Sequence, residues 1–373
     1  MTSLTHPPQI QKYRILEPQL GPSYVSRARN ILRPYLPEAL PLYRRLQFGR
    51  FFDTAYIFTN IDCWDAADLA RPLGKSSSGH PFLMAFVDRG CRPETEALFF
   101  GSWEACGPPV DESGSEDWTA IDHMVGALLS EVKQLPVPES IHRDFSVPEA
   151  APTANGTTDS DERDTVGFSR ADYGGHAANP NIMLWGAVHR RTMLVLERLG
   201  VISRAYKSGT VPNFTFIFSI DRLPPARELP PGLQWGVLTP EHFPLVRSRT
   251  QIPRQDRTMA VLPSLAIYPC DTTHDKSVQS KTAPIAWAFV GLDAALTTLH
   301  VEPEWRGKGL AKALSSKLFR EKMNQFWEPE VEQVAHGYVA VGNTASQMMC
   351  MSLGGKSDWE CYWIRVDLSK IDE

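Results

Sequence analysis

The sequence predicts a mixed α/β (α+β) fold in two successive parts, and three observations support this prediction. Short apolar runs bounded by turn residues, typical of strands, alternate with segments whose apolar residues recur at helical spacing. The 373 residues are enough for two domains with separate cores. Proline pairs at 224–225 and 230–231 indicate a semi-rigid connector, so we expect one domain over residues 1–232 and another over residues 233–373.

The first part alternates expected strands and helices around one unusual stretch. Strands are predicted at residues 56–59, 82–86, 98–103 and 213–220, and amphipathic helices at 121–135 and 185–199, the latter closed by Gly200. The stretch near 148–178 is small, polar and acidic. Because such a chain cannot bury enough apolar area to offset the entropy of ordering it, we expect a disordered insertion there.

The second part predicts a hairpin followed by helix, strand, helix and strand. Thr239 is a suitable N-cap for a helix with Pro240 in its first turn. Strands are expected at 262–268, 285–290, 296–301, 334–341 and 360–366, and helices at 309–323 and 344–353.

Composition excludes several classes of function. The formal net charge of −5 argues against nucleic acid or a membrane surface as the main partner, since both attract a basic face. No run approaches the ~18 apolar residues of a membrane helix, and no signal-peptide core is present, so we expect a cytoplasmic protein. The six cysteines form neither a CxxC pair nor a His/Cys cluster, which favours reduced thiols and no metal site. The oligomeric state cannot be read from the sequence.

A glycine-containing turn joins the strand at 296–301 to the helix that follows. Unpaired N–H groups in a first helical turn and the positive end of the helix dipole bind anions. Gly307 and Gly309 would let a phosphate approach the backbone, and Arg306 and Lys308 add positive charge. The Walker and dinucleotide fingerprints do not fit, because Gly-Lys-Gly stands here and the third glycine is missing. On its own, the turn is as typical of a simple helix cap.

Two motifs resemble the GNAT superfamily of acyl-CoA N-acyltransferases. Arg306-x-x-Gly309-x-Ala311, preceded by Val-x-Pro-x-Trp at 301–305, resembles its pyrophosphate motif. Gly342-Asn343, followed by Ala-Ser at 345–346 and Leu-Gly-Gly at 353–355, is similar to its asparagine motif, which usually ends Leu-Gly-Phe. The resemblance covers roughly residues 237–368.

A narrower resemblance is to the glycine N-acyltransferase-like branch. It rests on residues 284–289 and 303–306, on the Trp-rich segment 359–363 and on the layout of the first part. This resemblance implies two GNAT-like halves, each a mixed, mostly antiparallel central sheet flanked by helices, with a degenerate first half. Trp185 and His189 on the predicted helix of that half are interpreted as core and rim residues.

The resemblance implies a CoA site in the second half. The strand at 296–301 should splay from the strand at 334–341 and admit the pantetheine arm. The N–H of Leu299 would face the thioester carbonyl, and the N–H of Val301 would bind a pantetheine carbonyl. Asn343 and Ser346 would line the other wall. The pyrophosphate would bind the turn and the start of the helix: Arg306, Gly307, Lys308, Gly309, Leu310 and Ala311.

The sequence departs from the family pattern at both proton-transfer positions. Counting from Leu299, the usual basic glutamate is replaced by Ala295, and the usual acidic tyrosine is replaced by Cys350. Cys350 is a candidate acid, although a buried thiol more often only packs. The residue types that could replace the base, or donate the proton instead, are Asp293, His300, His336 and Tyr338.

The expected reaction is transfer of an acyl group, acetyl by default, from acyl-CoA to an amine by direct attack. The acceptor would be a small molecule or amino-acid-like amine, and no metal is required. Arg254 and Arg257, in the arginine-rich segment 247–257, are candidates to bind an acceptor carboxylate, while a solvated basic loop remains the alternative. A catalytically inactive CoA-binding scaffold, or a protein lysine acetyltransferase, are the other functions considered.

Overall fold

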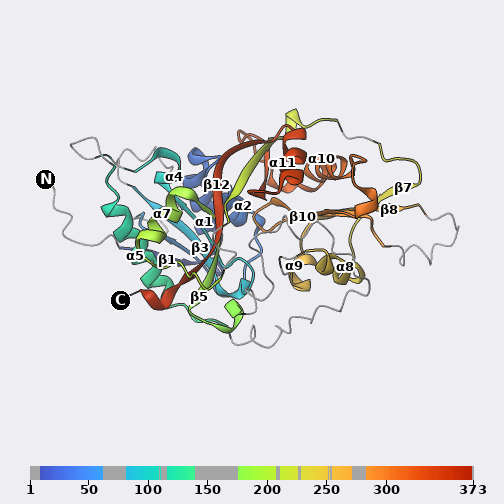
Figure 1. Cartoon of the computed structure of the whole chain (residues 1–373). Coiled ribbons are helices and arrows are strands. Elements are labelled where there is room, and N and C mark those ends of the chain that lie inside the picture. Colours follow the sequence, from blue (N-terminus) through green and yellow to red (C-terminus); the bar gives the residue numbers. More distant parts are fainter. Residues whose placement is uncertain are drawn as a thin grey trace. The chain divides into compact units, whose positions relative to one another are not determined.

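The computed structural model describes residues 9–61, 81–108, 110, 116–138, 175–206, 211–225, 228–250, 252, 254–270 and 283–371 (Figure 1). The chain divides into two compact units. Unit 1 comprises residues 1–149, 166–212 and 360–373, and unit 2 comprises residues 150–165 and 213–359. No helix among the described residues is long and apolar enough to cross a membrane.

Unit 1 is a mixed sheet flanked by helices. Its strands follow the order β1 (Gln11–Arg14), β2 (Ala55–Thr59), β3 (Leu83–Asp88), β4 (Ala97–Gly101), β5 (Ile182–His189) and β12 (Lys356–Asp367). Neighbouring strands are antiparallel except for the parallel pair β4–β5. Its helices are α1 (Gly21–Leu32), α2 (Leu40–Phe48), α4 (Ser102–Cys106), α5 (Thr119–Lys133) and α7 (Arg190–Arg198). Short 3-10 helices lie at η1 (Arg33–Tyr35), η2 (Arg89–Cys91) and η10 (Leu368–Lys370).

The core of unit 1 forms where α5 and α7 cover the sheet. The apolar spacing that predicted a helix at 121–135 places Ile121, Val125 and Leu128 inward, and all three are fully buried. They join one apolar cluster with Phe58 of β2 and Trp185 of β5. The amphipathic pattern therefore determines which face of α5 packs.

The helix predicted at 185–199 is wrong in its first part. Residues Ile182–His189 form strand β5, and every one of them is buried. A strand buried on both faces is a continuous apolar run, whose periodicity does not distinguish it from a buried helix. The helix begins instead at Arg190, where the Nδ1 of His189 accepts the N–H of Arg191 at 3.0 Å. Trp185 and His189 are buried, as core residues are, but they lie on a strand.

Unit 2 also contains mixed, mostly antiparallel strands. Its strands follow the order β6 (Asn213–Ser219), β11 (Val334–Ala340), β10 (Ala295–Val301), β9 (Ala286–Val290), β8 (Ser264–Pro269) and β7 (Leu233–Gly236). The pair β10–β11 is parallel and the other neighbours are antiparallel. The helices are α8 (Phe243–Ser248), α9 (Asp256–Met259), α10 (Leu310–Lys322) and α11 (Thr344–Ser352). The 3-10 helices are η6 (Ile220–Arg222), η7 (Pro240–His242), η8 (Pro303–Trp305) and η9 (Asn324–Phe326).

Local sequence signals account for the elements of unit 2. Thr239 caps the short η7 helix through a reciprocal bond with His242, and Pro240 occupies its first turn as expected. Helix α10 packs on β8, β9 and β10, and Phe319 contacts Phe218 of β6 with ring centroids 5.2 Å apart. The strand and helix order predicted for residues 239–366 is observed.

The unit boundaries differ from the position of the proline-rich connector. Strand β6 precedes the connector but groups with unit 2, because it pairs with β11. The end of β12 groups with unit 1, because it pairs with β5. The domain boundary at residues 232/233 therefore stays a prediction made from the sequence.

The structure describes only the last residues of the predicted insertion. Residues 148–174 lie outside the described residues. Residues 175–178 form a helical turn, and His176 is buried at 2.9 Å from Glu96. The described part of unit 1 thus includes residues 175–178, which lie within the stretch expected to be disordered.

Candidate functional site

The turn before α10 has the backbone geometry of an anion site. Gly307 and Gly309 have φ angles of 75° and 77°, a left-handed conformation that favours glycine. A Cβ built at either glycine would meet nothing within 4 Å, so the space beside the turn is open. Gly309 is the N-cap of α10, and the N–H groups that follow it have no partner inside the helix. The turn therefore presents donors to open space.

The charges around this turn favour an anion. The first turn of α10 contains no acidic residue. Arg306 is exposed, and its Nε donates to the carbonyl of Val301 at 3.0 Å. The Nζ of Lys308 lies 4.4 Å from the centre of the Trp305 ring. Together with the helix dipole, these two cations make the turn electropositive.

Strands β10 and β11 separate next to this turn. Their parallel ladder pairs Ala295 with His336 and Leu296 with Gly337, and no further pair follows along these described strands. The pairing of β10 with β9 is interrupted between Thr297 and His300, and Thr298 has a φ of 54°. Leu299 lies inside this bulge, so its backbone is displaced from regular strand geometry. A splayed strand pair with unpaired edges can bind an extended, amide-containing ligand.

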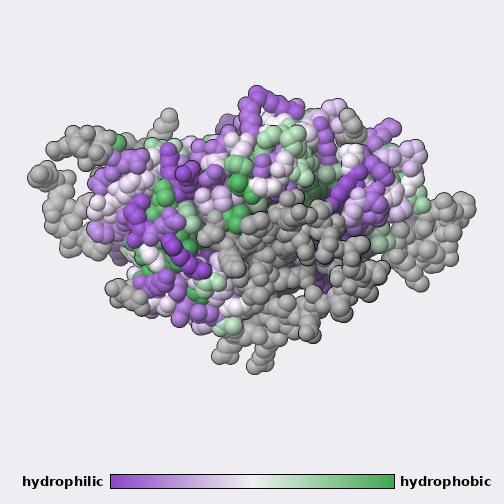
Figure 2. Space-filling view, viewed as in Figure 1, coloured by the Kyte–Doolittle hydropathy of each residue, from purple (hydrophilic) through white to green (hydrophobic). Residues whose placement is uncertain are grey.

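Asn343 and Ser346 lie at the start of α11. The Oδ1 of Asn343 accepts the N–H of Ser346 at 3.0 Å, which caps the helix. Cys350 is the single fully buried residue of α11, while Met348 and Met351 are 61% and 55% exposed. In Figure 2 the visible surface over α11 includes pale green, weakly hydrophobic atoms. The helix thus keeps an exposed apolar face beside the predicted second wall of the site.

Asp293, His336 and Tyr338 lie together where β10 and β11 begin to separate. The hydroxyl of Tyr338 donates to Oδ2 of Asp293 at 3.1 Å, and Nε2 of His336 is 3.9 Å from the same oxygen. Burial alone would raise the pKa of Asp293, but His336, the N–H of Ala295 and the Tyr338 hydroxyl outweigh it and lower the pKa. Asp293 is therefore ionised at neutral pH.

His300 lies apart from this group. Its ring stacks on Trp287 with centroids 4.6 Å apart, and its Nε2 is 3.5 Å from a carboxylate oxygen of Glu302. Burial lowers the pKa of His300 more than Glu302 raises it. His300 is thus a neutral ring packed against β9.

Cys350 is buried, and its burial raises the pKa of the thiol to about 12. A free thiol has a pKa of ~8.5, so Cys350 is a weaker acid than an ordinary thiol. This property weakens the interpretation of Cys350 as a proton donor, which stays a prediction.

The arginines of segment 247–257 do not converge on one point. Arg247 pairs with Asp256, and Arg249 pairs with Glu302 at 2.9 Å. Arg257 is exposed and donates to Gln255. Arg254 instead reaches β10, where its Nη2 donates to Oγ1 of Thr297 at 2.6 Å. Its Nε is buried and has no hydrogen-bond partner among the described residues.

The parallel pair of unit 1 leads to a different arrangement. Strands β4 and β5 also pair at two positions, Ala97 with Trp185 and Leu98 with Gly186. Strand β4 then enters the five-residue helix α4 through Gly101, whose Cβ would lie 2.3 Å from the Trp103 ring. In unit 1, side chains therefore fill the space that follows the parallel strand pair. In unit 2, the space beside the corresponding turn is open.

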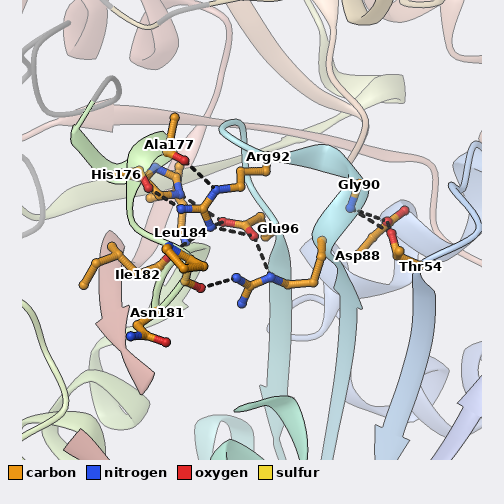
Figure 3. A network of polar contacts seen from close by, with 12 residues as sticks. Thr54, Asp88, Gly90, Arg92, Glu96, His176, Ala177, Asn181, Ile182 and Leu184 are labelled. Atoms are coloured by element: carbon orange, nitrogen blue, oxygen red, sulfur yellow. Dashed lines mark hydrogen bonds and ion pairs between the residues drawn. The ribbon is translucent and has the colours of Figure 1, made fainter. Parts of the chain in front are cut away.

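A buried ionic network lies at the start of β4 (Figure 3). Glu96 is fully buried between Arg89, at 3.1 Å, and His176, at 2.9 Å. Arg92 contacts the same carboxylate at 3.4 Å and also donates to the carbonyls of residues 177 and 182. Burial would raise the pKa of Glu96, but His176 and the two arginines lower it. The network ties residues 176–182 to β4, which is a structural role.

No group of three His, Cys, Asp or Glu residues suited to a metal ion occurs among the residues that the structure describes.

Comparison with known families identifies the chain. The profile described as the acyl-CoA N-acyltransferase verG N-terminal domain matches residues 16–216, more than half of the 373 residues. The chain belongs to this family. A second profile, the FR47-like protein, matches residues 278–364, which include the turn before α10 and the strands β10 and β11. The resemblance to a two-half GNAT acyl-CoA N-acyltransferase is thereby confirmed.

Among the similar solved structures, a Drosophila protein supports this fold. It is 14% identical, with a TM-score of 0.53 over 96% of this chain and 98% of that one. A tandem GNAT protein from the clavulanic acid biosynthesis pathway is 10% identical, with a TM-score of 0.45 over 96% and 99% of the two chains. A GCN5-related N-acetyltransferase from Sphaerobacter thermophilus is 13% identical, with a TM-score of 0.33 over 50% and 60%. No curated protein sequence matches the verG-type chain.

Proposed function

We propose that this protein transfers an acyl group, acetyl by default, from acyl-CoA to the amine of a small or amino-acid-like acceptor by direct attack on the thioester. The observation that carries this proposal is the open, left-handed turn at Gly307–Gly309, which directly follows the strand that splays from β11. The turn suits a pyrophosphate, and the splayed strand pair suits an extended pantetheine arm. Together they match the parts of a CoA molecule in order.

In this proposal the turn binds the diphosphate through the N–H groups of residues 306–311 and the charges of Arg306 and Lys308. The pantetheine arm lies between β10 and β11, with the N–H of Val301 bound to one of its carbonyls. Asn343 and Ser346 form the facing wall. The N–H of Leu299, in the bulge of β10, stabilises the oxyanion that forms on the thioester carbon.

The acceptor in this proposal carries a carboxylate that binds Arg254. The side chain of Arg254 contacts β10 at Thr297, two positions before Leu299, and its buried Nε lacks a hydrogen-bond partner in the described part of the chain. A guanidinium is suited to bind a carboxylate through two N–H groups, and the contact with Thr297 brings this one to β10. Arg257 would then lie at the outer end of the acceptor channel.

The proposed compartment is the cytoplasm. The cysteines among the described residues are free thiols, at positions 91, 106, 270, 350 and 361. Reduced thiols are typical of that compartment.

A CoA-binding scaffold without turnover is the second candidate. It is favoured by Ala295, which is 2% exposed, and by the raised pKa of Cys350, since both usual proton-transfer residues are missing. Release of CoA from acetyl-CoA, measured against a panel of amines, amino acids and a lysine peptide, separates the candidates. We expect release with at least one small amine. Tight acetyl-CoA binding with no release across the panel would leave the scaffold.

A further inference from the structure

Asp293 is held rigidly at the hairpin between β9 and β10. The N–H of Gly291 donates to the carbonyl of Ala295 at 2.8 Å, and Ala294 has a left-handed φ of 60°. The Oδ1 of Asp293 accepts the N–H of Ala295 at 3.2 Å. One carboxylate oxygen is thus used by the turn, and the other contacts Tyr338 of β11.

Tyr338 lies at the point where the two strands part. The last paired residue of β11 is Gly337, opposite Leu296, and Tyr338 follows it. The residue is half-buried, and its hydroxyl bonds Asp293 of the hairpin. A ligand between β10 and β11 would therefore reach the Tyr338 hydroxyl before any other titratable group of this cluster.

His336 lies two residues before Tyr338 on β11, where β10 and β11 are still paired. It lies on the same face of β11 as Tyr338, with the two rings edge to face and their centroids 5.4 Å apart. Its side chain is fully buried, and neither ring nitrogen has a hydrogen-bond partner among the described residues. A buried imidazole with two unsatisfied nitrogens is costly and uncommon. His336 therefore lies behind the Asp293 carboxylate, 3.9 Å from its Oδ2, without a hydrogen bond to it.

We propose that Asp293 and Tyr338 form a proton relay that replaces the glutamate missing at Ala295. This inference rests on the proposed acyl transfer. The acceptor ammonium gives a proton to the Tyr338 oxygen while the Tyr338 proton passes along its hydrogen bond to Oδ2 of Asp293. Tyr338 touches the acceptor, and Asp293 acts through it.

The protons and electrons of this step balance. The amine lone pair forms the C–N bond, and the C–S bond breaks with its electron pair on sulfur. The nitrogen loses two protons between ammonium and amide. One reaches Asp293, which is 17% exposed, and then solvent, and the other passes through Tyr338 to the CoA thiolate.

Asp293→Asn is the sharpest test, because an asparagine oxygen can still accept the Ala295 N–H while the negative charge is lost. The control is Asp367→Asn, since Asp367 makes the same kind of turn in unit 1, accepting the Ser369 N–H at 3.1 Å. Acetyl-CoA affinity, thermal stability and kcat/KM for the best amine of the panel are measured from about pH 6 to about pH 9.

We expect Asp293→Asn to lower kcat/KM by ~10²–10⁴ at neutral pH, with acetyl-CoA affinity unchanged. The loss should shrink as the pH approaches the pKa of the acceptor amine, ~8–10, because a neutral amine needs less help from a base. Tyr338→Phe should show the same pattern, and the double variant should be no slower than either single one.

A loss that does not vary with pH, or one that Asp367→Asn shares, would overturn the relay. So would a normal rate for Asp293→Asn in an enzyme whose parent turns over. If the parent binds acetyl-CoA but releases no CoA, the acyl-transfer proposal itself fails, and the relay fails with it.

Discussion

Each of the two units contains a short parallel strand pair, and the segment that follows this pair differs between the units. In each, a parallel pair is joined at two positions and then stops, β4–β5 in unit 1 and β10–β11 in unit 2. In unit 2 the strand continues into the open turn at Gly307–Gly309 and the 13-residue helix α10. In unit 1 it continues into the five-residue helix α4, and Trp103 packs onto Gly101. A shared fold thus gives a binding turn only where the residues after the strand leave its N–H groups accessible.

Buried charge is also distributed differently in the two units. In unit 1, Glu96 lies among Arg89, Arg92 and His176, and each contact holds one part of the chain to another. In unit 2, Asp293 has a single hydroxyl partner on β11 and a histidine beyond hydrogen-bond distance. The close ion pairs around Glu96 hold parts of the chain together, whereas Asp293 lies near the point where β10 and β11 separate and is available for chemistry.

The largest expected effect is on the stability of unit 1. Glu96→Gln leaves Arg89 and Arg92 buried without their countercharge, which costs about 3–5 kcal/mol. Thermal unfolding should show this loss, while acetyl-CoA affinity of the folded fraction stays unchanged. Asp122→Asn, which breaks a partly exposed pair with Arg198, should cost less than about 1 kcal/mol. Equal stability of both variants would show that the network does not stabilise the fold.

The pH dependence of Glu96 follows from its lowered pKa. Its stabilisation is fully present above the ordinary value of 4.5 and is lost as the pH falls through the lower pKa of the folded state. The stability difference between the parent and Glu96→Gln should therefore narrow below about pH 4.5. A difference that persists unchanged in acid would contradict this origin.

An intermediate effect is expected for the acceptor. Arg254→Gln removes a charge that we assign to an acceptor carboxylate, so KM for an amino-acid acceptor should rise by ~10–100-fold. The KM for a simple amine and the acetyl-CoA affinity should not change. Arg247→Gln is the matched control, because Arg247 already pairs with Asp256. The same rise in KM in both variants would show that the total charge of segment 247–257, and not Arg254 itself, causes the effect.

The smallest effect on turnover is expected for Cys350→Ser. Burial raises the pKa of this thiol to about 12, so a packing role predicts a lower melting temperature and an unchanged single-turnover rate. A general acid would instead contribute ~10²–10⁴ in rate. A loss of that size in the folded variant would restore Cys350 as the proton donor.

Sequence reasoning predicted the glycine turn before α10 because its signal is local. Gly307, Gly309 and the basic residues between and before them are contiguous, and the backbone needs no distant partner to form the turn. It mistook β5 for part of a helix, because Ile182–His189 is a continuous apolar run without strand alternation and its paired strands β4 and β12 are far away in sequence. It also gave no prediction for α1 and α2, where buried Arg44 and Arg45 obscure the apolar face of α2.

The contacts of Asp293 show that side-chain contacts between segments far apart in sequence are also not predicted by local patterns. Strand alternation predicted that His336 and Tyr338 share a face. Their contact with Asp293, 45 residues from Tyr338, depends on how β11 pairs with β10 and on the hairpin turn. Only the register of the folded sheet brings that carboxylate to the tyrosine.

The central claim is that the turn before α10 binds the diphosphate of acyl-CoA, and the direct measurement is acetyl-CoA affinity of Gly309→Glu by calorimetry. Gly200→Glu in unit 1 is the control, because Gly200 has a φ of 68° and equally open surroundings, so both variants carry the same backbone strain. We predict that Gly309→Glu weakens binding by at least ~100-fold, about 2.8 kcal/mol, and that Gly200→Glu leaves it unchanged. Parental affinity in folded Gly309→Glu would contradict the account.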